Sequence, residues 1–319
     1  MGKRERKISR FTGHWITEQG AGTVEYVIVV LVAIVIGSGL LAFSNQVSGQ
    51  VSKTGDSISS WFSKANGSGG TGGGNAGGGN SGTDSRIEEL KKKDPADWTL
   101  DDQKAVAEDI GKKGNSSELY AKAKDAMDAG TEWSITLTDG KDMTYRIIGI
   151  NHDDLADGSG KAGLTFEATN DAMGMQTMNA TDTNTGGWEK SKLRGRLNSG
   201  DLWTQLPVDL QVRIKSVEKM TDNKDGGSAG TATTTTDKVF PLSSTEVYGD
   251  SQSDGTQYEY YASKGVTWPS YSGASLGFRH WTRSVPPSGS TSFCCVGSNG
   301  AWGTNNARNP TYVFPAFSF

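Results

Sequence analysis

Hydrophobic residues form one long run near the start of the chain and shorter periodic patterns after it. The run covers the twenty residues from Val24 to Phe43, and its only charged residue is Glu25. In a helix that rises 1.5 Å per residue, such a run spans about 30 Å, the thickness of the hydrocarbon core of a bilayer. The pattern therefore predicts a transmembrane helix.

The pattern changes twice between this run and residue 86. The next hydrophobic residues stand among polar ones at spacings that predict an amphipathic extension of the same helix to residue 65. Residues 66–85, NGSGGTGGGNAGGGNSGTDS, lack a hydrophobic anchor. They predict a flexible linker with an end-to-end distance of roughly 25 Å.

Residues 86–130 predict short polar helices. Thr99 is suited to cap one helix, and Gly111 or Gly114 to end it, because glycine adopts the left-handed conformation found after helices. Gly130 ends a second helical pattern in the same way. We expect these helices to pack against the following domain, and a helical stalk is the alternative.

From Glu132 onward, hydrophobic and polar residues alternate with the two-residue period of β-strands. Alternating residues on both sides of Asp139-Gly140 predict a β-hairpin that ends near Ile150. The acidic stretch 151–160, NHDDLADGSG, lacks the alternating carboxylates and distal Glu of a calcium loop. A solvated turn is therefore the preferred interpretation, with calcium binding as the alternative.

Charge is distributed unevenly along the 319 residues. The net charge is −4, but residues 1–20 carry +3, so the rest of the chain carries −7. This balance argues against nucleic acid as a partner. Basic residues before the hydrophobic run favour a cytoplasmic N-terminus and place the large remainder outside the membrane. The 43 glycines are consistent with the predicted linker.

A motif at the start of the hydrophobic run carries a first resemblance. Gly20 is followed by four residues and then by Glu25 and Tyr26. This spacing, with the basic leader 1–20, resembles the processing site of Tad (Flp-type) pilins. The resemblance implies that a prepilin peptidase cuts after Gly20 and that Ala21 becomes the N-terminus. It also implies that Glu25 pairs with the α-amino group of a neighbouring pilin subunit, because a buried carboxylate needs a partner.

The length of the chain departs from the Tad pattern. Major pilins of that family are very short, whereas about 270 residues follow Phe43 here. The resemblance therefore implies a minor pilin, a tip subunit or a pseudopilin that carries a cargo domain.

Motifs near the C-terminus carry a second resemblance, which covers roughly residues 132–319. They are FRHWTRS from Phe278, FCCV from Phe293, GAW from Gly300 and VFPAF from Val313, preceded by WEKSKLRGRLN from Trp188 and FPLSSTEV from Phe240. Together they resemble a bacterial family of extracellular domains with a C-type-lectin fold. The resemblance implies a framework made of Trp281, Arg283, Trp302 and Pro315. Thr282 and Phe314 depart from the Leu and Arg of the family pattern.

Some domains of this kind are variable proteins of diversity-generating retroelements, which mutate adenines, chiefly in Asn codons. Residues 285–319 contain no Lys, Glu, Gln or Met and are rich in Ser, Asn, Thr and Gly, as such codons would yield. A Ser- and Gly-rich loop region is the alternative. The resemblance implies exposed, adaptable contacts to an unknown extracellular protein or glycan at Ser290, Ser292, Cys294, Cys295, Ser298, Thr304, Arg308, Thr311 and Tyr312.

The resulting prediction is an α+β chain in five parts. They are the leader 1–20, a transmembrane or pilin helix 21–65, the linker 66–85, short helices 86–130 and a C-type-lectin-like mixed α+β domain 131–319. We expect a membrane precursor that becomes a pilin-like subunit of the cell surface or pilus, with an adhesin domain and no catalytic residue, metal or cofactor. The alternative is a signal-anchored extracellular domain with a structural role or an enzymatic one like that of formylglycine-generating oxidases, which use cysteines.

Overall fold

The computed structural model describes residues 81–222, 232–249 and 254–319, which belong to one compact unit. The predicted processing site at Gly20 and the hydrophobic run Val24–Phe43 lie outside the described residues. Helix α2 begins at Ser81, so the last five residues of the predicted linker 66–85 are helical.

Helices precede the first strand of the described region. They are α2 (Ser81–Lys92), the 3-10 turn η1 (Pro95–Asp97), α3 (Leu100–Lys113), the turn η2 (Gly114–Ser116) and α4 (Tyr120–Ala129). The predicted cap of α3 is confirmed: the Thr99 hydroxyl accepts from the Asp102 amide, and the Asp102 carboxylate accepts from the Thr99 amide. Gly114 ends α3 and Gly130 ends α4, both with a positive φ.

The first sheet has five strands in the order β1-β2-β3-β12-β7, and all of its pairs are antiparallel. The strands are β1 (Glu132–Thr136), β2 (Asp142–Ile150), β3 (Leu164–Ala168), β12 (Ala316–Ser318) and β7 (Val239–Phe240). The predicted hairpin is confirmed as β1 and β2. Strand β12 lies between β3 and the edge strand β7, so the last residues of the chain form an inner strand of this sheet.

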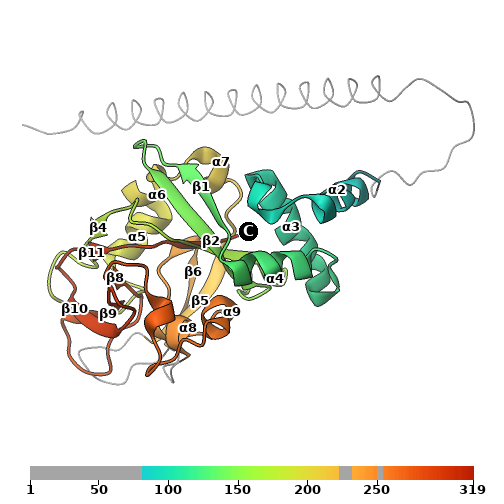
Figure 1. Cartoon of the computed structure of the whole chain (residues 1–319). Coiled ribbons are helices and arrows are strands. Elements are labelled where there is room, and N and C mark those ends of the chain that lie inside the picture. Colours follow the sequence, from blue (N-terminus) through green and yellow to red (C-terminus); the bar gives the residue numbers. More distant parts are fainter. Residues whose placement is uncertain (1–80, 223–231, 250–253) are drawn as a thin grey trace, which may run out of the picture. The chain divides into compact units, whose positions relative to one another are not determined.

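The second sheet has the order β10-β9-β8-β11-β4. Its strands are β10 (Trp302–Asn306), β9 (Ser292–Val296), β8 (His280–Trp281), β11 (Thr311–Tyr312) and β4 (Met175–Gln176). Only the β8–β11 pair is parallel among the pairs described in this sheet. Figure 1 shows β8, β9 and β10 on the side of the domain away from helices α2 to α4.

A two-stranded ribbon and several short helices complete the domain. The ribbon pairs β5 (Val217–Asp222) with β6 (Ala232–Asp237). The helices are α5 (Lys192–Ser199), α6 (Asp201–Gln205), α7 (Val208–Gln211), α8 (Ser244–Tyr248) and α9 (Glu259–Ser263), with the 3-10 turn η3 (Ser272–Ala274).

The helices before residue 130 share one hydrophobic core with the sheets. Leu90, Val106 and Leu119 belong to the same cluster of buried side chains as the strands. Trp98 stacks on Trp133 of β1 with ring centroids 6.2 Å apart. A Cβ atom at Gly163 would stand 1.9 Å from the carbonyl oxygen of Ala107, so only glycine lets α3 approach this closely. These helices are therefore part of the domain and not a stalk.

The predicted fold class is wrong as stated. The described region is a mixed α+β domain, and none of its helices is long and apolar enough to cross a membrane. The longest of them, α3, has 14 residues, and at 1.5 Å per residue it covers about 21 Å, less than a bilayer core of about 30 Å. The sequence also predicted a C-type-lectin fold for this domain. The structure instead has two five-stranded sheets and a separate two-stranded ribbon.

Candidate ligand-binding surface

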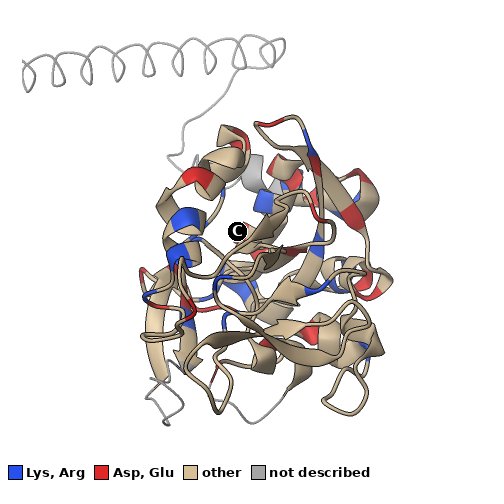
Figure 2. Cartoon of the chain, turned by 90° about the vertical axis from the view of Figure 1, so that its left-hand side faces the viewer, with Lys and Arg blue, Asp and Glu red and all other residues tan. Residues whose placement is uncertain are grey.

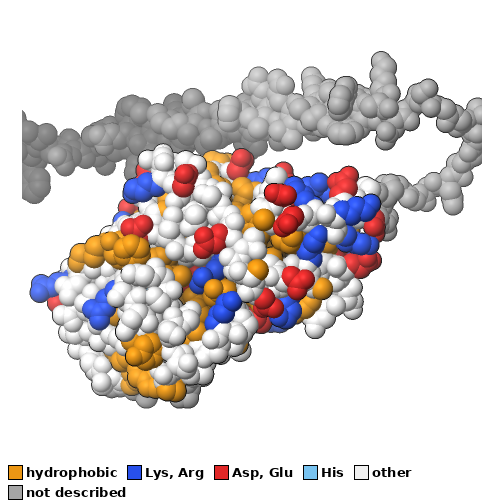
Figure 3. All heavy atoms as spheres, in the orientation of Figure 1, with side chains coloured by type: hydrophobic (Ala, Val, Ile, Leu, Met, Phe, Trp, Pro, Cys, Tyr) orange, Lys and Arg blue, Asp and Glu red, His pale blue; other side chains and the backbone are white. Residues whose placement is uncertain are grey.

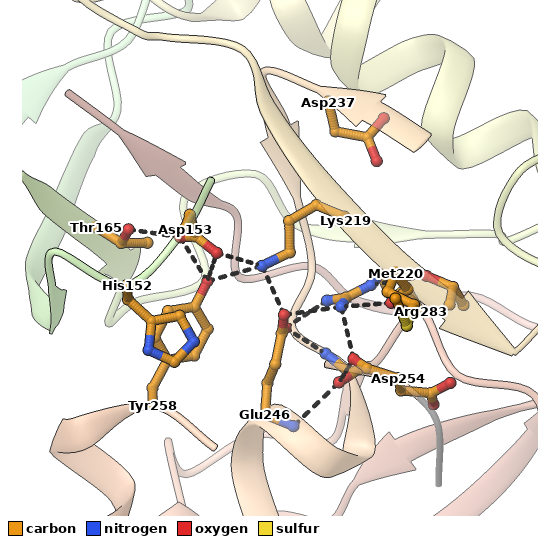
Figure 4. A network of polar contacts seen from close by, with 12 residues as sticks. His152, Asp153, Thr165, Lys219, Met220, Asp237, Glu246, Asp254, Tyr258 and Arg283 are labelled. Atoms are coloured by element: carbon orange, nitrogen blue, oxygen red, sulfur yellow. Dashed lines mark hydrogen bonds and ion pairs between the residues drawn. The ribbon is translucent and has the colours of Figure 1, made fainter. Parts of the chain in front are cut away.

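Four buried charged side chains form a network that connects the β5–β6 ribbon to α8 and to the segment after β8 (Figure 4). Lys219 on β5 donates to Asp153 at 2.6 Å and to the Tyr258 hydroxyl at 3.0 Å, and it lies 2.5 Å from Glu246. Both terminal nitrogens of Arg283 donate hydrogen bonds to the Glu246 carboxylate. None of the four is more than 4% exposed.

Local sequence explains how Glu246 enters this network. Ser243 caps α8, and its hydroxyl accepts from the Glu246 amide at 3.0 Å while Glu246 accepts from the Ser243 amide at 2.9 Å. This capping box fixes the carboxylate at the first turn of the helix. Arg283 also donates to the carbonyl oxygens of Met220 and Asp254, so it connects three separate segments.

The electrostatics of the network favour its ionised form. Burial opposes the charge on Asp153, but the Lys219 ammonium outweighs it and lowers the pKa of Asp153 to about 2. Burial also opposes the charge on Glu246, and Arg283 and Lys219 together lower its pKa. The Asp153 and Glu246 carboxylates therefore stay ionised at neutral pH, in contact with Lys219 and Arg283.

A cleft of about 470 Å³ opens above this network. Asp153, Lys219 and Glu246 form part of its lining, and His152 at its edge contacts Glu259 through Nδ1 at 3.0 Å. Burial lowers the pKa of His152, but Glu259 and Asp153 outweigh this and raise it above its usual value. The three ammonium donors of Lys219 match its three partners, Asp153, Glu246 and Tyr258, so this lysine serves to hold the network together.

The acidic stretch 151–160 is a largely exposed turn, as the sequence predicts, except that Asp153 is buried on Lys219. Thr165 and Tyr258 donate to the same carboxylate. Within residues 81–222, 232–249 and 254–319, no group of three His, Cys, Asp or Glu residues is placed to hold a metal ion.

A second feature is an aromatic surface built by the loop after α9 and the turn between β9 and β10. A Cβ atom at Gly300 would stand 2.1 Å from the carbonyl oxygen of Tyr271, so the loop lies directly on this turn. Gly300 has a φ of 88°, which other residues rarely adopt. Ser275 donates to the carbonyl oxygen of Ser298 at 2.6 Å, and Tyr248 donates to that of Gly300 at 2.7 Å.

This contact holds large aromatic side chains at the surface. Trp268 is 54% exposed and Tyr271 is 36% exposed. The Trp268 ring meets Trp302 on β10 edge to face, with centroids 5.1 Å apart. Figure 3 shows hydrophobic side chains at the surface of the lower end of the domain, among mostly uncharged ones. We call Trp268, Tyr271 and Trp302 the aromatic surface.

Strand register determines which predicted contacts share a face with Trp302. Cross-strand partners lie on the same face of a sheet, and alternate residues of a strand do too. Trp302 pairs with Val296 and Thr304 pairs with Cys294. The same face of the sheet continues across the next strands, because Val296 pairs with His280 and His280 pairs with Tyr312. Ser292, Cys294, Thr304 and Tyr312 therefore lie on the face of Trp302, and Cys295 and Thr311 on the opposite face.

Burial divides the predicted contacts further. Thr304 and Ser298 are exposed, and Ser292 and Tyr312 are half-buried. Cys294, Cys295 and Thr311 are buried, so the prediction that these three are exposed is corrected. Cys294 and Cys295 belong to the central part of the sheet, and the Thr311 hydroxyl accepts from Asn305 at 2.8 Å.

Ser290 and Arg308 are exposed but lie in other loops. The carbonyl oxygen of Ser290 accepts from the amide of Asn184 at 2.9 Å. Arg308 forms an ion pair with Asp182 at 2.8 Å. Both residues therefore contact the 179–187 segment, which the sequence did not predict as a neighbour.

The predicted framework residues occupy the interior apart from Trp302, which is half-buried. Trp281 is buried and donates to the carbonyl oxygen of Gln176 at 2.8 Å. The carbonyl oxygen of Pro315 accepts from Ala168 at 2.9 Å, next to the β3–β12 pair. His280 is buried against the ring of Phe314, with ring centroids 4.8 Å apart.

Sequence reasoning missed Trp268 and Tyr271 as surface residues and Lys219 as a network residue. The Ser243-x-x-Glu246 spacing was a readable signal for the cap on α8. For Trp268 the available signal was its position in the sequence TWPSYSG, a turn-forming stretch. Lys219 alternates with exposed Glu218 and Met220 in a strand and carried no such signal.

The aromatic surface lies in a part of the chain without acidic residues. From Lys264 to Phe319 there are one Lys and three Arg and no Asp or Glu. Figure 2 shows charged residues of both signs over much of the domain and fewer of them in its lower part. The contacts offered there are mainly aromatic, hydroxyl and amide groups.

Comparison with known proteins finds a family similarity for part of this domain. No curated protein and no solved structure matches the chain. Residues 162–319, which include both the aromatic surface and most of the buried network, are similar to the family described as a domain of unknown function, DUF6273.

Proposed function

We propose that the chain is a surface subunit that displays its folded domain to bind an extracellular protein through the aromatic surface. The observation that supports the binding role is the exposure of Trp268 and Tyr271 beside Trp302, on a well-packed support. Rigid aromatic side chains next to Ser, Thr and Asn are typical of adaptable binding surfaces. Trp and Tyr also supply much of the binding energy at protein interfaces.

The buried network supports this role by keeping the surface rigid. Arg283 ties β5 and α8 to the segment that follows β8, and β8 pairs directly with β9. A surface that is already in its binding conformation loses less entropy when a ligand binds. Binding requires no chemistry from the cleft, where the donors of Lys219 already have partners.

Substitution of the exposed tryptophans tests the binding role. We expect peptides selected on the full chain from a phage-displayed random library to bind Trp268→Ala or Trp302→Ala about 30-fold more weakly, the loss typical of an interface hot spot. Affinity is measured by surface plasmon resonance on immobilised protein. Val212→Ala, at a distant valine that is 70% exposed, serves as the control and should bind as the wild type does.

The selected peptides can also contradict the binding role. Peptides that bind Trp268→Ala and Trp302→Ala as tightly as the wild type would show that the aromatic surface is not the contact site. The protein could instead bind glycans on an array, with that binding lost in the same two variants. That result would keep the aromatic surface as the contact site and change the class of ligand from protein to glycan.

The mode of display is proposed from the residues around Gly20 and Glu25, whose spacing matches a Tad prepilin site. We expect mass spectrometry of the mature chain to find Ala21 as its first residue. We also expect Glu25→Ala to abolish surface display, because the new α-amino group of a neighbouring subunit would lose its carboxylate partner. Glu18→Ala, in the leader, is the matched control.

Two results would contradict this mode of display. One is a mature chain that still begins at Met1 or Gly2. The other is normal display of Glu25→Ala, and either result would favour a simple anchored domain.

A further inference from the structure

Strand β10 forms one edge of the second sheet, because it pairs with β9 and with no other strand that the structure describes. It carries Trp302, which belongs to the aromatic surface. Figure 1 shows β10 at the outer margin of the domain, beyond β9 and β8. An edge strand presents backbone N–H and C=O groups to its surroundings, so it is able to pair with a strand from another chain.

The ladder between β9 and β10 determines which backbone groups of β10 point outward. In an antiparallel pair, positions whose backbones bond to the partner strand alternate with positions whose backbones point away from it. The Ala307 amide donates to the carbonyl oxygen of Thr291 at 2.9 Å, so counting back in twos makes Trp302 and Thr304 outward positions. Cys294, the partner of Thr304, agrees: its amide and carbonyl both bond to the segment after β8, on the side away from β10.

Two of the outward positions are open. The amide and carbonyl groups of Trp302 and Thr304 form no hydrogen bond with any residue that the structure describes. At Asn306 the outward groups are already used, because the amide donates to the Asn305 side chain at 3.0 Å and the carbonyl accepts from Asn309 at 2.9 Å. The backbone groups of Trp302 and Thr304 therefore form a short open edge.

Other sheet edges of the described region are closed, short or far from the aromatic surface. The Asn198 side chain covers β7 and donates to the Val239 carbonyl at 2.9 Å. Strand β4 has only two residues. In β1 the Leu137 amide bonds to the carbonyl of Lys141 across the hairpin, so Ser134 is an outward position by the same count. However, Figure 1 shows β1 at the upper end of the domain and β10 at the lower end.

The side chains beside the open edge suit an added strand with apolar residues. Side chains of neighbouring strands continue the same two faces, so every second residue of an added strand would lie on the face of Trp302 and Thr304. Trp268 already packs on Trp302 at this face. Strand β10 contains no charged residue and no proline, which are the usual protections of an edge.

We propose that the protein partner binds by strand addition. An extended segment of the partner pairs its backbone with Trp302 and Thr304 and places apolar side chains against Trp268 and Trp302. This inference rests on the proposed function and names the part of the partner that is recognised. The backbone bonds hold the segment along the edge, and the aromatic rings select its side chains. A segment of about five residues, the usual length of a strand, covers the open edge.

An N-methyl scan of the peptides selected on the full chain tests the pairing on the wild-type protein. N-methylation removes one backbone donor and blocks strand pairing at that position. We expect the affinity, measured by surface plasmon resonance, to fall about tenfold at every second position of the bound segment, the upper range for one lost hydrogen bond. At the positions between them, where the amide points away from β10, we expect changes within about twofold.

A proline in the open edge tests the same pairing from the protein side. Thr304→Pro removes an outward amide and leaves the ladder with β9, in which this amide takes no part. Gly303 precedes it, and glycine best tolerates the restriction that proline places on the preceding residue. We expect the peptides to bind this variant about tenfold more weakly. Ser134→Pro, which removes an outward amide of β1, is the control and should bind as the wild type does. Circular dichroism verifies that both variants are folded.

The inference is overturned if the N-methyl scan shows no alternation, or if folded Thr304→Pro binds the peptides as tightly as the wild type. Loss of binding in Trp302→Ala would in that case still support the proposed function, so the two failures are distinguishable. Peptides that ignore both tryptophan substitutions would overturn both. A wild-type dimer in analytical ultracentrifugation that Thr304→Pro dissociates would assign the open edge to a second copy of the chain and would also overturn the inference.

Discussion

Arg283→Met is expected to lower the free energy of unfolding of the domain by about 3–5 kcal/mol, the usual cost of removing one partner of a buried ion pair. The guanidinium is fully buried, and it donates to Glu246, Thr221 and three backbone carbonyl oxygens. Methionine fills a similar volume but supplies no donor. Among the described residues, Lys219 would then be the remaining cationic partner of the Glu246 carboxylate, and the four-residue network would carry a net negative charge.

Urea unfolding of the purified full chain, followed by tryptophan fluorescence, measures this change. Arg308→Met is the matched control, because Arg308 forms an exposed ion pair with Asp182. Exposed pairs contribute at most about 1 kcal/mol, so the control should stay near the wild type. A loss from Arg283→Met no larger than that of the control would contradict the role given to the network.

A double variant separates charge from packing. Arg283→Met with Glu246→Met removes one base and one acid and leaves Lys219 paired with Asp153. We expect this variant to be more stable than the sum of the two single changes predicts, by about 0.5–3 kcal/mol, because neither partner is left uncompensated. Strict additivity would mean that the two side chains do not act as a pair.

Local signals were sufficient to predict the elements whose contacts are close in sequence. The cap at Thr99, the stop at Gly114 and the turn at Gly140 depend on residues within one helical turn or one hairpin. These signals act through the backbone of their own segment, so they do not depend on contacts with the rest of the fold.

The contacts that complete the fold connect distant parts of the chain and could not be predicted in this way. Lys219 meets Asp153 across 66 positions, and Ser318 meets Thr165 across 153. Nothing in the stretch 151–160 distinguishes the buried Asp153 from its exposed neighbour Asp154. The sequence therefore indicated an acidic turn and missed that one of its carboxylates is buried.

The candidate surface was predicted in part for the same reason. Period-2 patterning of β9 and β10 is consistent with a sheet, but exposure depends on what covers each face. The segment at Tyr271 lies on the turn at Gly300, and this contact determines which aromatic rings stay at the surface. The composition rule that indicated Thr304 and Ser298 also indicated Cys294 and Cys295, because composition carries no information on burial.

Acid is expected to destabilise the domain between about pH 6.5 and pH 4, and His280 should be a main cause. Burial, with the positive charge of Arg146, lowers the pKa of His280 to about 4, although its Nδ1 donates to the carbonyl oxygen of Phe278. In the unfolded chain a histidine has a pKa near 6.5. Between these values the unfolded state binds a proton that the folded state does not, so stability falls as the pH falls.

The expected loss for His280 is about 3 kcal/mol over this window, from a pKa difference of roughly 2.5 units. Other groups act elsewhere or in the opposite sense. The contribution of Asp153, whose pKa is about 2, is lost only below about pH 4. His152, with a raised pKa, gives a contribution that is present below pH 6.5 and is lost as the pH rises through its folded value. Burial raises the pKa of Glu167, which adds stability as the pH falls.

Comparison of the wild type with His280→Asn isolates the histidine, because the other titrating groups are common to both proteins. The asparagine amide can replace the Nδ1 donor, and it does not titrate. We expect the free energy of unfolding, measured by urea titration at pH 7 and at pH 4.5, to fall less in the variant by about 2–3 kcal/mol. His152→Asn is the control and should keep the steep fall below pH 6.5, since His152 is protonated in both states there. An equal fall in His280→Asn and the wild type would mean that His280 takes up its proton without unfolding the domain.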